Sequence, residues 1–355
     1  MYLKAKMKMS GETKALGWID RLLAVWIVLC IIIGLAFGTY FPDLSEQLEI
    51  GIPIGLFLMI YPAMTKIELG EMKEALKSPK QVSIIVFFNY AVNPFLLYIL
   101  GYIFFDQLFP ALGLVTIEMG KNLWTGLILL GVAPCIAMVL VWTDLADGNG
   151  PLGIVLMAWN SIIQVLTTPF YIALLVGTYI AIDMMMIGQS VLLYLGLPLL
   201  LGVITRREVI KRKSEEWLNN KLLPYFNAIQ LLALLFTMIV MFALQGDVIV
   251  QHPELIWQMA IPISLFFFLL FNLVYFTTER VGYNSQDCST MAFHCTGRNF
   301  ELAIAIALTA FASIPMVAVS TVVGPLIEIP VMLVLVKIAL RRKKHHEMRK
   351  QALSQ

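Results

Sequence analysis

The sequence is poor in charged residues. Asp, Glu, Lys and Arg make up 14% of its 355 residues, whereas 59% are hydrophobic and the mean hydropathy is +0.83. A soluble domain is only about half apolar. The shortage of charge therefore excludes a sizeable soluble domain and indicates that lipid is the solvent of most of the chain.

Cysteine and histidine are also scarce. Each occurs four times, and Cys30, Cys135, Cys288 and Cys295 lie in or beside apolar segments, without the pattern of a secreted disulfide framework. His294 precedes Cys295, but adjacent residues on a helix point to different faces, and no second pair has metal-ligand spacing. We expect free thiols and no bound cofactor.

Long apolar runs are abundant. A bilayer crossing needs about 20 mostly apolar residues, and such runs recur along nearly the whole chain. They lie at roughly 20–41, 47–65, 82–105, 123–142, 152–180, 188–205, 222–244, 256–276, 287–311 and 314–340. The sequence predicts an all-α polytopic membrane protein of about ten transmembrane helices. Its parts are a segment 1–19, a transmembrane domain 20–340 and a basic tail 341–355.

The basic residues predict the orientation in the membrane. An even number of spans places both termini on one side. Basic residues gather between Lys66 and Lys80, between Arg206 and Lys221, and in the tail, whereas the alternate loops are acidic apart from Lys121. The positive-inside rule then places both termini in the cytoplasm, with the domain in the cell (inner) membrane. This charge pattern indicates orientation and not nucleic-acid binding.

The two halves of the domain, about 20–180 and 188–340, are weakly similar. Leu56 to Ile60 recur as Leu235 to Ile239, and Asn93 and Asn272 stand at the same offset. Five helices in each half would make the second copy inverted. Inverted repeats are common in secondary transporters, whose sites lie near the midplane where paired helices are interrupted. We therefore expect functional side chains in the fourth and fifth helices of each half.

Helix 4 contains Gly131-Val132-Ala133-Pro134-Cys135. Proline inside a membrane helix removes a backbone donor and frees carbonyl groups, which predicts an interruption here. A thiol at that point, near the N-terminal end of the following half-helix, suits a soft metalloid. The alternative is that Cys135 is a small buried hydrophobe beside an ordinary kink.

Helix 9 carries Arg298, Asn299 and Glu301 near its centre. Charge at that depth costs about 3 kcal/mol or more per group, so these side chains should face a cavity and pair. Arg298 and Glu301 are three residues apart, close enough on a helix for an ion pair. Such a pair is either part of a functional site or purely structural.

Helix 10 carries Glu328 between Pro325 and Pro330 in an otherwise apolar span. A carboxyl isolated in this way can alternate between its protonated and ionised forms. The alternatives are that Glu328 caps freed backbone donors or pairs with Arg298.

Helix 5 adds a polar stripe with a spacing near four residues. Its members are Asn160, Ser161, Gln164, Thr167 and Thr168. The stripe either lines a transport pathway or bonds neighbouring helices to one another.

Three blocks of sequence resemble one known family. Ala133 to Leu152 reads APCIAMVLVWTDLADGNGPL, Arg298 to Ala305 reads RNFELAIA, and Gly324 to Met332 reads GPLIEIPVM. These blocks closely resemble the arsenite efflux permeases of the third arsenical-resistance family, and the resemblance extends over roughly 20–340. It implies ten helices, an inverted repeat, and helices 4 and 9 that are broken and cross, in a superfamily that includes sodium-coupled bile-acid symporters.

The resemblance also implies roles for two residues. The family's required cysteine in helix 4 matches Cys135, and its required glutamate in helix 10 matches Glu328. We expect a secondary active transporter that exports arsenite from the cytoplasm in exchange for protons. Cys135 would bind trivalent arsenic as the substrate, and Glu328 would carry the proton. Transport of antimonite and coupling to sodium are left open.

Two rival functions are weighed against this one. In a sodium-coupled symporter of an organic anion, Asn160, Gln164, Asn299 and Glu301 would coordinate cations. Arg298 would then meet the anion. The other rival is a membrane enzyme or sensor that uses Cys135 as a nucleophile or redox thiol. No histidine in a suitable helical position accompanies that cysteine, so we do not expect an enzyme.

Overall fold

The computed structural model describes residues 23–68, 70, 80–136 and 138–353. In these ranges the chain is helical, apart from connecting turns and one isolated β-bridge. The predicted N-terminal segment 1–19 and most of the basic loop between Lys66 and Lys80 lie outside the described residues.

Six helical stretches within the described ranges are long and apolar enough to cross a bilayer. Three of them are single helices: Gly150–Leu175 (α12), Glu254–Val281 (α18) and Pro315–His345 of α21 (Pro315–Leu353). The other three are composite: Lys80–Ala111 (α7, Lys80–Val86; α8, Asn93–Gly101; α9, Phe109–Ala111; with η2 and η3), Met184–Arg212 (α13, Met184–Val191; α14, Leu197–Arg212) and Glu215–Leu244 (α15, Glu215–Trp217; α16, Leu223–Leu244). Each apolar run predicted from the sequence overlaps one of these stretches or a shorter helix. The inverted repeat stays a prediction.

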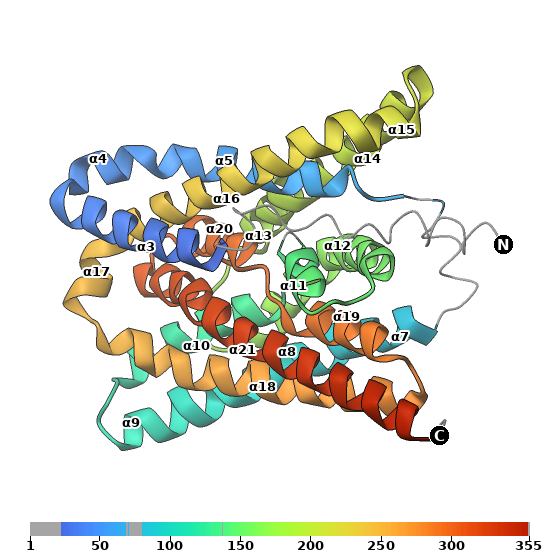
Figure 1. Ribbon diagram of the computed structural model, residues 1–355. Helices are drawn as coiled ribbons and strands as arrows, with labels where there is room; N and C mark the ends of the chain where they lie inside the picture. Colours follow the sequence, from blue (N-terminus) through green and yellow to red (C-terminus); the bar gives the residue numbers. More distant parts are fainter. Residues whose placement is uncertain (1–22, 69, 71–79, 137, 354–355) are drawn as a thin grey trace.

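The shorter helices complete the molecule. They are α3 (Leu23–Tyr40), α4 (Pro42–Gln47), α5 (Gly51–Met64), α10 (Ile117–Gly131), α11 (Val139–Leu145), α17 (Gly246–Gln251), α19 (Ser285–Thr296) and α20 (Phe300–Ala310). Helix α16 packs beside α3 and α5, and α18 packs beside α21 (Figure 1). The basic tail is helical too, because α21 continues to Leu353.

The distribution of apolar and polar side chains fits a lipid environment. Large apolar side chains such as Leu166 and Leu232 are 77% and 66% exposed, whereas Asn89, Asn160 and Gln164 are fully buried. Hydrocarbon cannot hydrogen-bond to an amide, so polar side chains must find partners inside the bundle. This distribution places the chemically active groups between the helices.

Two glycines let α3 approach the backbone of α16. Gly34 and Gly38 are one turn apart on α3, and both face carbonyl groups of the other helix. A Cβ on Gly34 would lie 2.6 Å from the oxygen of Ile239, and a Cβ on Gly38 would lie 2.0 Å from the oxygen of Ala243. Small residues at this spacing allow close packing in membranes, where apolar burial alone does not drive helices together.

Replacing Gly38 by Ala should therefore destabilise the protein by about 1–3 kcal/mol, because the new methyl group would overlap the backbone oxygen of Ala243 and force α3 away from α16. Thermal unfolding of the purified protein in detergent measures this as a lower melting temperature. Gly188→Ala is the matched control, since nothing lies within 4 Å of a Cβ placed there. Equal melting temperatures for both variants would contradict the close contact.

Candidate functional site

Two interrupted helices meet at the centre of the bundle. One interruption separates α10, which ends at Gly131, from α11, and the other separates α19 from α20. The two breaks pair with each other as a short antiparallel bridge. The N–H of Cys135 donates to the oxygen of Gly297 (3.0 Å), and the N–H of Asn299 donates to the oxygen of Ala133 (2.8 Å). The interruption predicted at Pro134 is confirmed.

The chemistry of the residues explains this pairing. Pro134 offers no N–H and disfavours a helical conformation of the residue before it, which favours a break here, and the freed backbone groups need partners from elsewhere in the protein. Asn299 begins the next helix, because its Oδ1 accepts a hydrogen bond from the N–H of Leu302 (3.0 Å). A Cβ on Gly297 would stand 3.1 Å from the Cβ of Cys135, so a larger residue there would require the two segments to shift slightly apart.

The side chain of Cys135 is buried at this crossing, with 2% exposure. The backbone N–H groups of Met138 and Val139, at the start of α11, interact with its sulfur. The carboxyl groups of Glu301 and Glu328 are close enough to interact with it electrostatically. One thiol and two carboxyls from three different segments are thus all buried and interact electrostatically.

Arg298 lies in the break between α19 and α20, and its guanidinium is surrounded by oxygen atoms. Nε donates to the oxygen of Thr296 (3.1 Å), Nη1 to the oxygen of Gly131 (3.1 Å), and Nη2 to Oδ1 of Asn89 (3.1 Å) and to the oxygen of Cys295. The side chain is 2% exposed. Its hydrogen bonds hold it against the ends of both interrupted helices.

The predicted ion pair between Arg298 and Glu301 is wrong. Among the described residues, no ion pair joins the guanidinium to a carboxylate. An ion pair at this spacing requires a continuous helix, but α20 begins at Phe300, so Arg298 is not on the same helical surface as Glu301. Its partners are neutral oxygens instead.

Glu301, Glu328 and Gln164 are buried without full hydrogen-bond satisfaction. Oε1 of each carboxyl, and both polar atoms of the Gln164 side chain, have no hydrogen-bond partner among the described residues. Buried polar atoms are nearly always paired in proteins, and an exception calls for an explanation such as a catalytic role or a bound water or ion. These three residues are therefore candidates for groups that meet a substrate or a proton.

The polar stripe of α12 contains residues that bond neighbouring helices and one residue that is free to line a transport pathway. Asn160 accepts a hydrogen bond from Asn89 (3.1 Å), and Thr168 donates to the oxygen of Val132 (3.3 Å), so both bond neighbouring helices. Ser161 donates to a carbonyl of its own helix. Gln164 lies between them on the stripe as the member without a bonded partner in the described structure.

Asn89 and Asn93 were missed by the sequence reasoning as members of this centre. Asn89 donates to the oxygen of His294, and Asn93 donates to the oxygen of Cys295. Both asparagines also bond to each other (3.0 Å). The available signal was two asparagines one turn apart in an apolar run, followed by proline. Pro94 interrupts the regular pattern, and Phe87–Val92 forms a π-helical stretch (η2), a frequent feature of functional sites.

His294 is structural in this arrangement. Its Nδ1 lies 2.9 Å from the oxygen of Thr290, and its Nε2 lies 2.9 Å from the oxygen of Gly153. Both ring nitrogens are thus engaged by backbone. Within the described ranges, no group of three or more His, Cys, Asp or Glu side chains could hold a metal ion.

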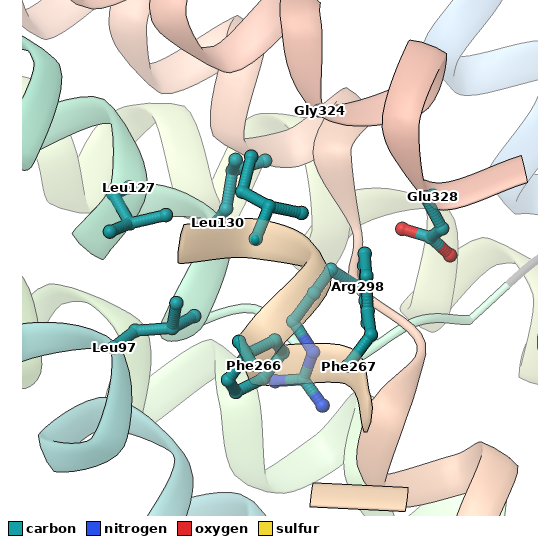
Figure 2. Close-up of a pocket in the computed structure, with 9 residues that line it drawn as sticks. Leu97, Leu127, Leu130, Phe266, Phe267, Arg298, Gly324 and Glu328 are labelled. Atoms are coloured by element: carbon teal, nitrogen blue, oxygen red, sulfur yellow. The ribbon is translucent and has the colours of Figure 1, made fainter. Parts of the chain in front are cut away.

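A pocket lies beside the crossing. Its walls are Leu97, Leu127, Leu130, Ile263, Phe266, Phe267, Arg298, Gly324 and Glu328. Figure 2 shows Glu328 at one side and Arg298 near the Phe266 ring, whose centroid is 5.7 Å from the guanidinium carbon. Cys135 does not line this pocket. The structure thus separates a pocket with Arg298 and Glu328 from the more enclosed thiol.

Helix α11, the second half of the first interrupted helix, interacts with two lysines. Lys343 of α21 forms an ion pair with Asp147, just after α11. Lys66 lies near Asp144 of α11. Burial lowers the pKa of Lys66 to about 8, and the Asp144 carboxylate opposes that change. These contacts link α11 to the loop after α5 and to α21.

Comparisons with known proteins identify the family. Residues 53–252 match the Sodium Bile acid symporter family. The arsenical-resistance protein Acr3 of Alkaliphilus metalliredigens is 33% identical over 341 residues, which cover 94% of this chain and 95% of that protein. This chain belongs to the Acr3 arsenical-resistance family.

Two further relatives extend the comparison. Acr3 of Corynebacterium glutamicum is 34% identical over 353 residues, covering 93% of this chain and 92% of that protein. An uncharacterized transporter of Synechocystis sp. is 35% identical over 339 residues, covering 91% and 88%. The resemblance inferred from the three sequence blocks is confirmed. This member of the Acr3 family is a multi-pass membrane transporter, and its family is not an enzymatic one.

Replacing Asn89 by Leu should lower the free energy of unfolding by about 3 kcal/mol or more, because Arg298, Asn93 and Asn160 would each lose a buried partner. Thermal melting in detergent measures the loss. Asn220→Leu is the control, since Asn220 is exposed. A melting temperature equal to that of the control would show that the asparagine network does not hold the crossing together.

Proposed function

We propose that this transporter exports arsenite from the cytoplasm in exchange for protons. Cys135 binds the arsenic, and Glu328 carries the proton. The observation that carries the proposal is a buried thiol at the crossing of two interrupted helices, close enough to the carboxyls of Glu301 and Glu328 for electrostatic interaction. The arsenical-resistance relatives support trivalent arsenic as the substrate class.

The binding step is a ligand exchange on arsenic. Arsenite is a neutral weak acid at cytoplasmic pH, and trivalent arsenic has a strong preference for sulfur. A bond forms between arsenic and the Cys135 sulfur while one arsenic–oxygen bond breaks. The thiol proton and the departing hydroxide leave as water. One sulfur ligand keeps the step reversible, whereas three would trap the metalloid, and a transporter must release its cargo.

The coupling step needs a group that exchanges a proton at the same place. Glu328 lies between Pro325 and Pro330 of α21, buried to 2% exposure, and its Oε1 has no hydrogen-bond partner in the described structure. Coupling follows if the arsenic-bound and protonated forms favour opposite access states of the site. In this proposal α10 to α12 and α19 to α21 move relative to the remaining helices, with both termini in the cytoplasm.

The geometry gives less support to a sodium-coupled symporter of an organic anion. In that function the Arg298 guanidinium would meet the anion, but it donates hydrogen bonds to four protein oxygens instead. Asn160 likewise bonds Asn89. Gln164, Asn299 and Glu301 remain candidates to line the path of the substrate or of the exchanged ion.

Replacing Cys135 by Ser should reduce the initial rate of arsenite uptake into everted vesicles by at least about tenfold, because a hydroxyl is too hard a ligand for trivalent arsenic. Rates are compared at equal amounts of folded protein. Cys30→Ser is the control, since Cys30 is also a buried free thiol but lies on α3. Wild-type rates for Cys135→Ser would remove this thiol from the mechanism.

Replacing Glu328 by Gln should abolish the acceleration of arsenite uptake by an acid vesicle interior, because the amide keeps the size of the side chain but cannot release a proton. The measurement compares uptake with and without the pH gradient. The melting temperature checks folding, and Glu279→Gln serves as the control because Glu279 is exposed at the end of α18. A variant that still responds to the gradient would exclude Glu328 as the proton carrier.

A further inference from the structure

The oxygens around Arg298 come from the ends of two half-helices. Gly131 is the last residue of α10, and Cys295 and Thr296 are the last residues of α19. Carbonyl groups at a helix C-terminus have no partner within the helix and carry the negative end of its dipole. The guanidinium donates to one such carbonyl from α10 and to two from α19. Two negative helix ends therefore converge on one positive side chain.

Neutral oxygen atoms from unwound backbone and helix C-termini are the usual ligands of coupling cations in transporters with interrupted helices. Here the shell contains three backbone carbonyls and Oδ1 of Asn89. No carboxylate forms an ion pair with Arg298 among the described residues. The shell thus has the composition of a site for a small monovalent cation, and a covalently attached cation occupies it.

We propose that Arg298 is a resident cation: its guanidinium fills a sodium-type site formed by the C-terminal ends of α10 and α19, so the transporter needs no bound sodium ion. The backbone bridge fixes the Arg298 backbone, because the neighbouring residues Gly297 and Asn299 both bond to the opposite break. The guanidinium thus occupies the site as a bound ion would, but it cannot dissociate because it is covalently attached to the chain. This deepens the proposed proton-coupled function and does not depend on which metalloid is carried.

The residues around the guanidinium would be able to hold an ion in its absence. Asn89 and Asn93 are fully buried and already bond to this group of oxygens. Oδ1 of Asn93 has no hydrogen-bond partner within the described structure, which offers one more oxygen. Removing the guanidinium would take this donor from the buried oxygens of Gly131 and Thr296, and would leave those of Asn89 and Cys295 with the Asn93 amide, which already donates to both. A small cation relieves the cost of buried oxygens that have lost a partner.

The test removes the guanidinium and supplies sodium. Wild type, Arg298→Ala and Arg298→Gln are purified in sodium chloride and melted in either sodium chloride or choline chloride at equal ionic strength. Wild type should melt at the same temperature in both salts. Each variant should melt at least about 2 °C higher in sodium than in choline, because an ion that binds only the folded state stabilises it.

Arg206→Ala is the matched control for loss of a buried arginine. Arg206 is 8% exposed, and it pairs with the carboxylates of Glu68 and Glu215 in addition to donating a hydrogen bond to the oxygen of Thr65 (3.4 Å). Its removal should lower the melting temperature equally in both salts. A sodium response of the same size in this control would assign the effect to general salt stabilisation and would overturn the proposal.

Two other results would also overturn it: a wild type whose melting depends on sodium, or Arg298 variants that do not respond to sodium. Variants that stay unfolded even when prepared in sodium count against it as well, because the ion should restore the site. A separate arm measures arsenite uptake by wild-type vesicles in sodium or choline. Absence of uptake in both salts would refute the proposed function, whereas the melting comparison would still decide the role of Arg298.

Discussion

The backbone pairing between the two interrupted helices is the constraint on which the centre of this transporter depends. Breaking a helix in a membrane exposes N–H and C=O groups that lipid cannot satisfy. Here each break supplies the partner of the other, through the bonds from Cys135 to Gly297 and from Asn299 to Ala133. The crossing of the two breaks therefore fixes where Cys135, Arg298 and Glu301 can lie.

The remaining freed groups are satisfied by side chains from surrounding helices. Asn89 and Asn93 of the neighbouring stretch bond the last carbonyls of α19, and Thr168 of α12 bonds the carbonyl of Val132. These asparagines also hold Arg298 and Asn160 in one connected network. A network of this kind is stable only when nearly all its members are paired, because an unpaired polar group costs more at low dielectric.

That network divides the charged residues into two groups. Arg298 donates hydrogen bonds to carbonyl oxygens and makes no ion pair with a carboxylate in the described structure. Glu301 and Glu328 each keep an oxygen without a partner there. A direct salt bridge would have stabilised the carboxylates and tied them to one protonation state. Because backbone carbonyls accept hydrogen bonds from Arg298, Glu301 and Glu328 remain available to exchange protons near the Cys135 thiol.

The sequence alone determined the membrane class, the positions of the helices, the interruption at Pro134 and the family. Each of these depends on local composition, on the chemistry of proline or on short specific motifs. The partners of the buried polar residues were decided only by the tertiary structure. Spacing along a helix suggested that Arg298 pairs with Glu301, but the break before Phe300 turned the guanidinium toward Gly131 and Asn89, which are far away in sequence. Such partners could not be predicted because they depend on which helix ends cross, and that is set by long-range packing.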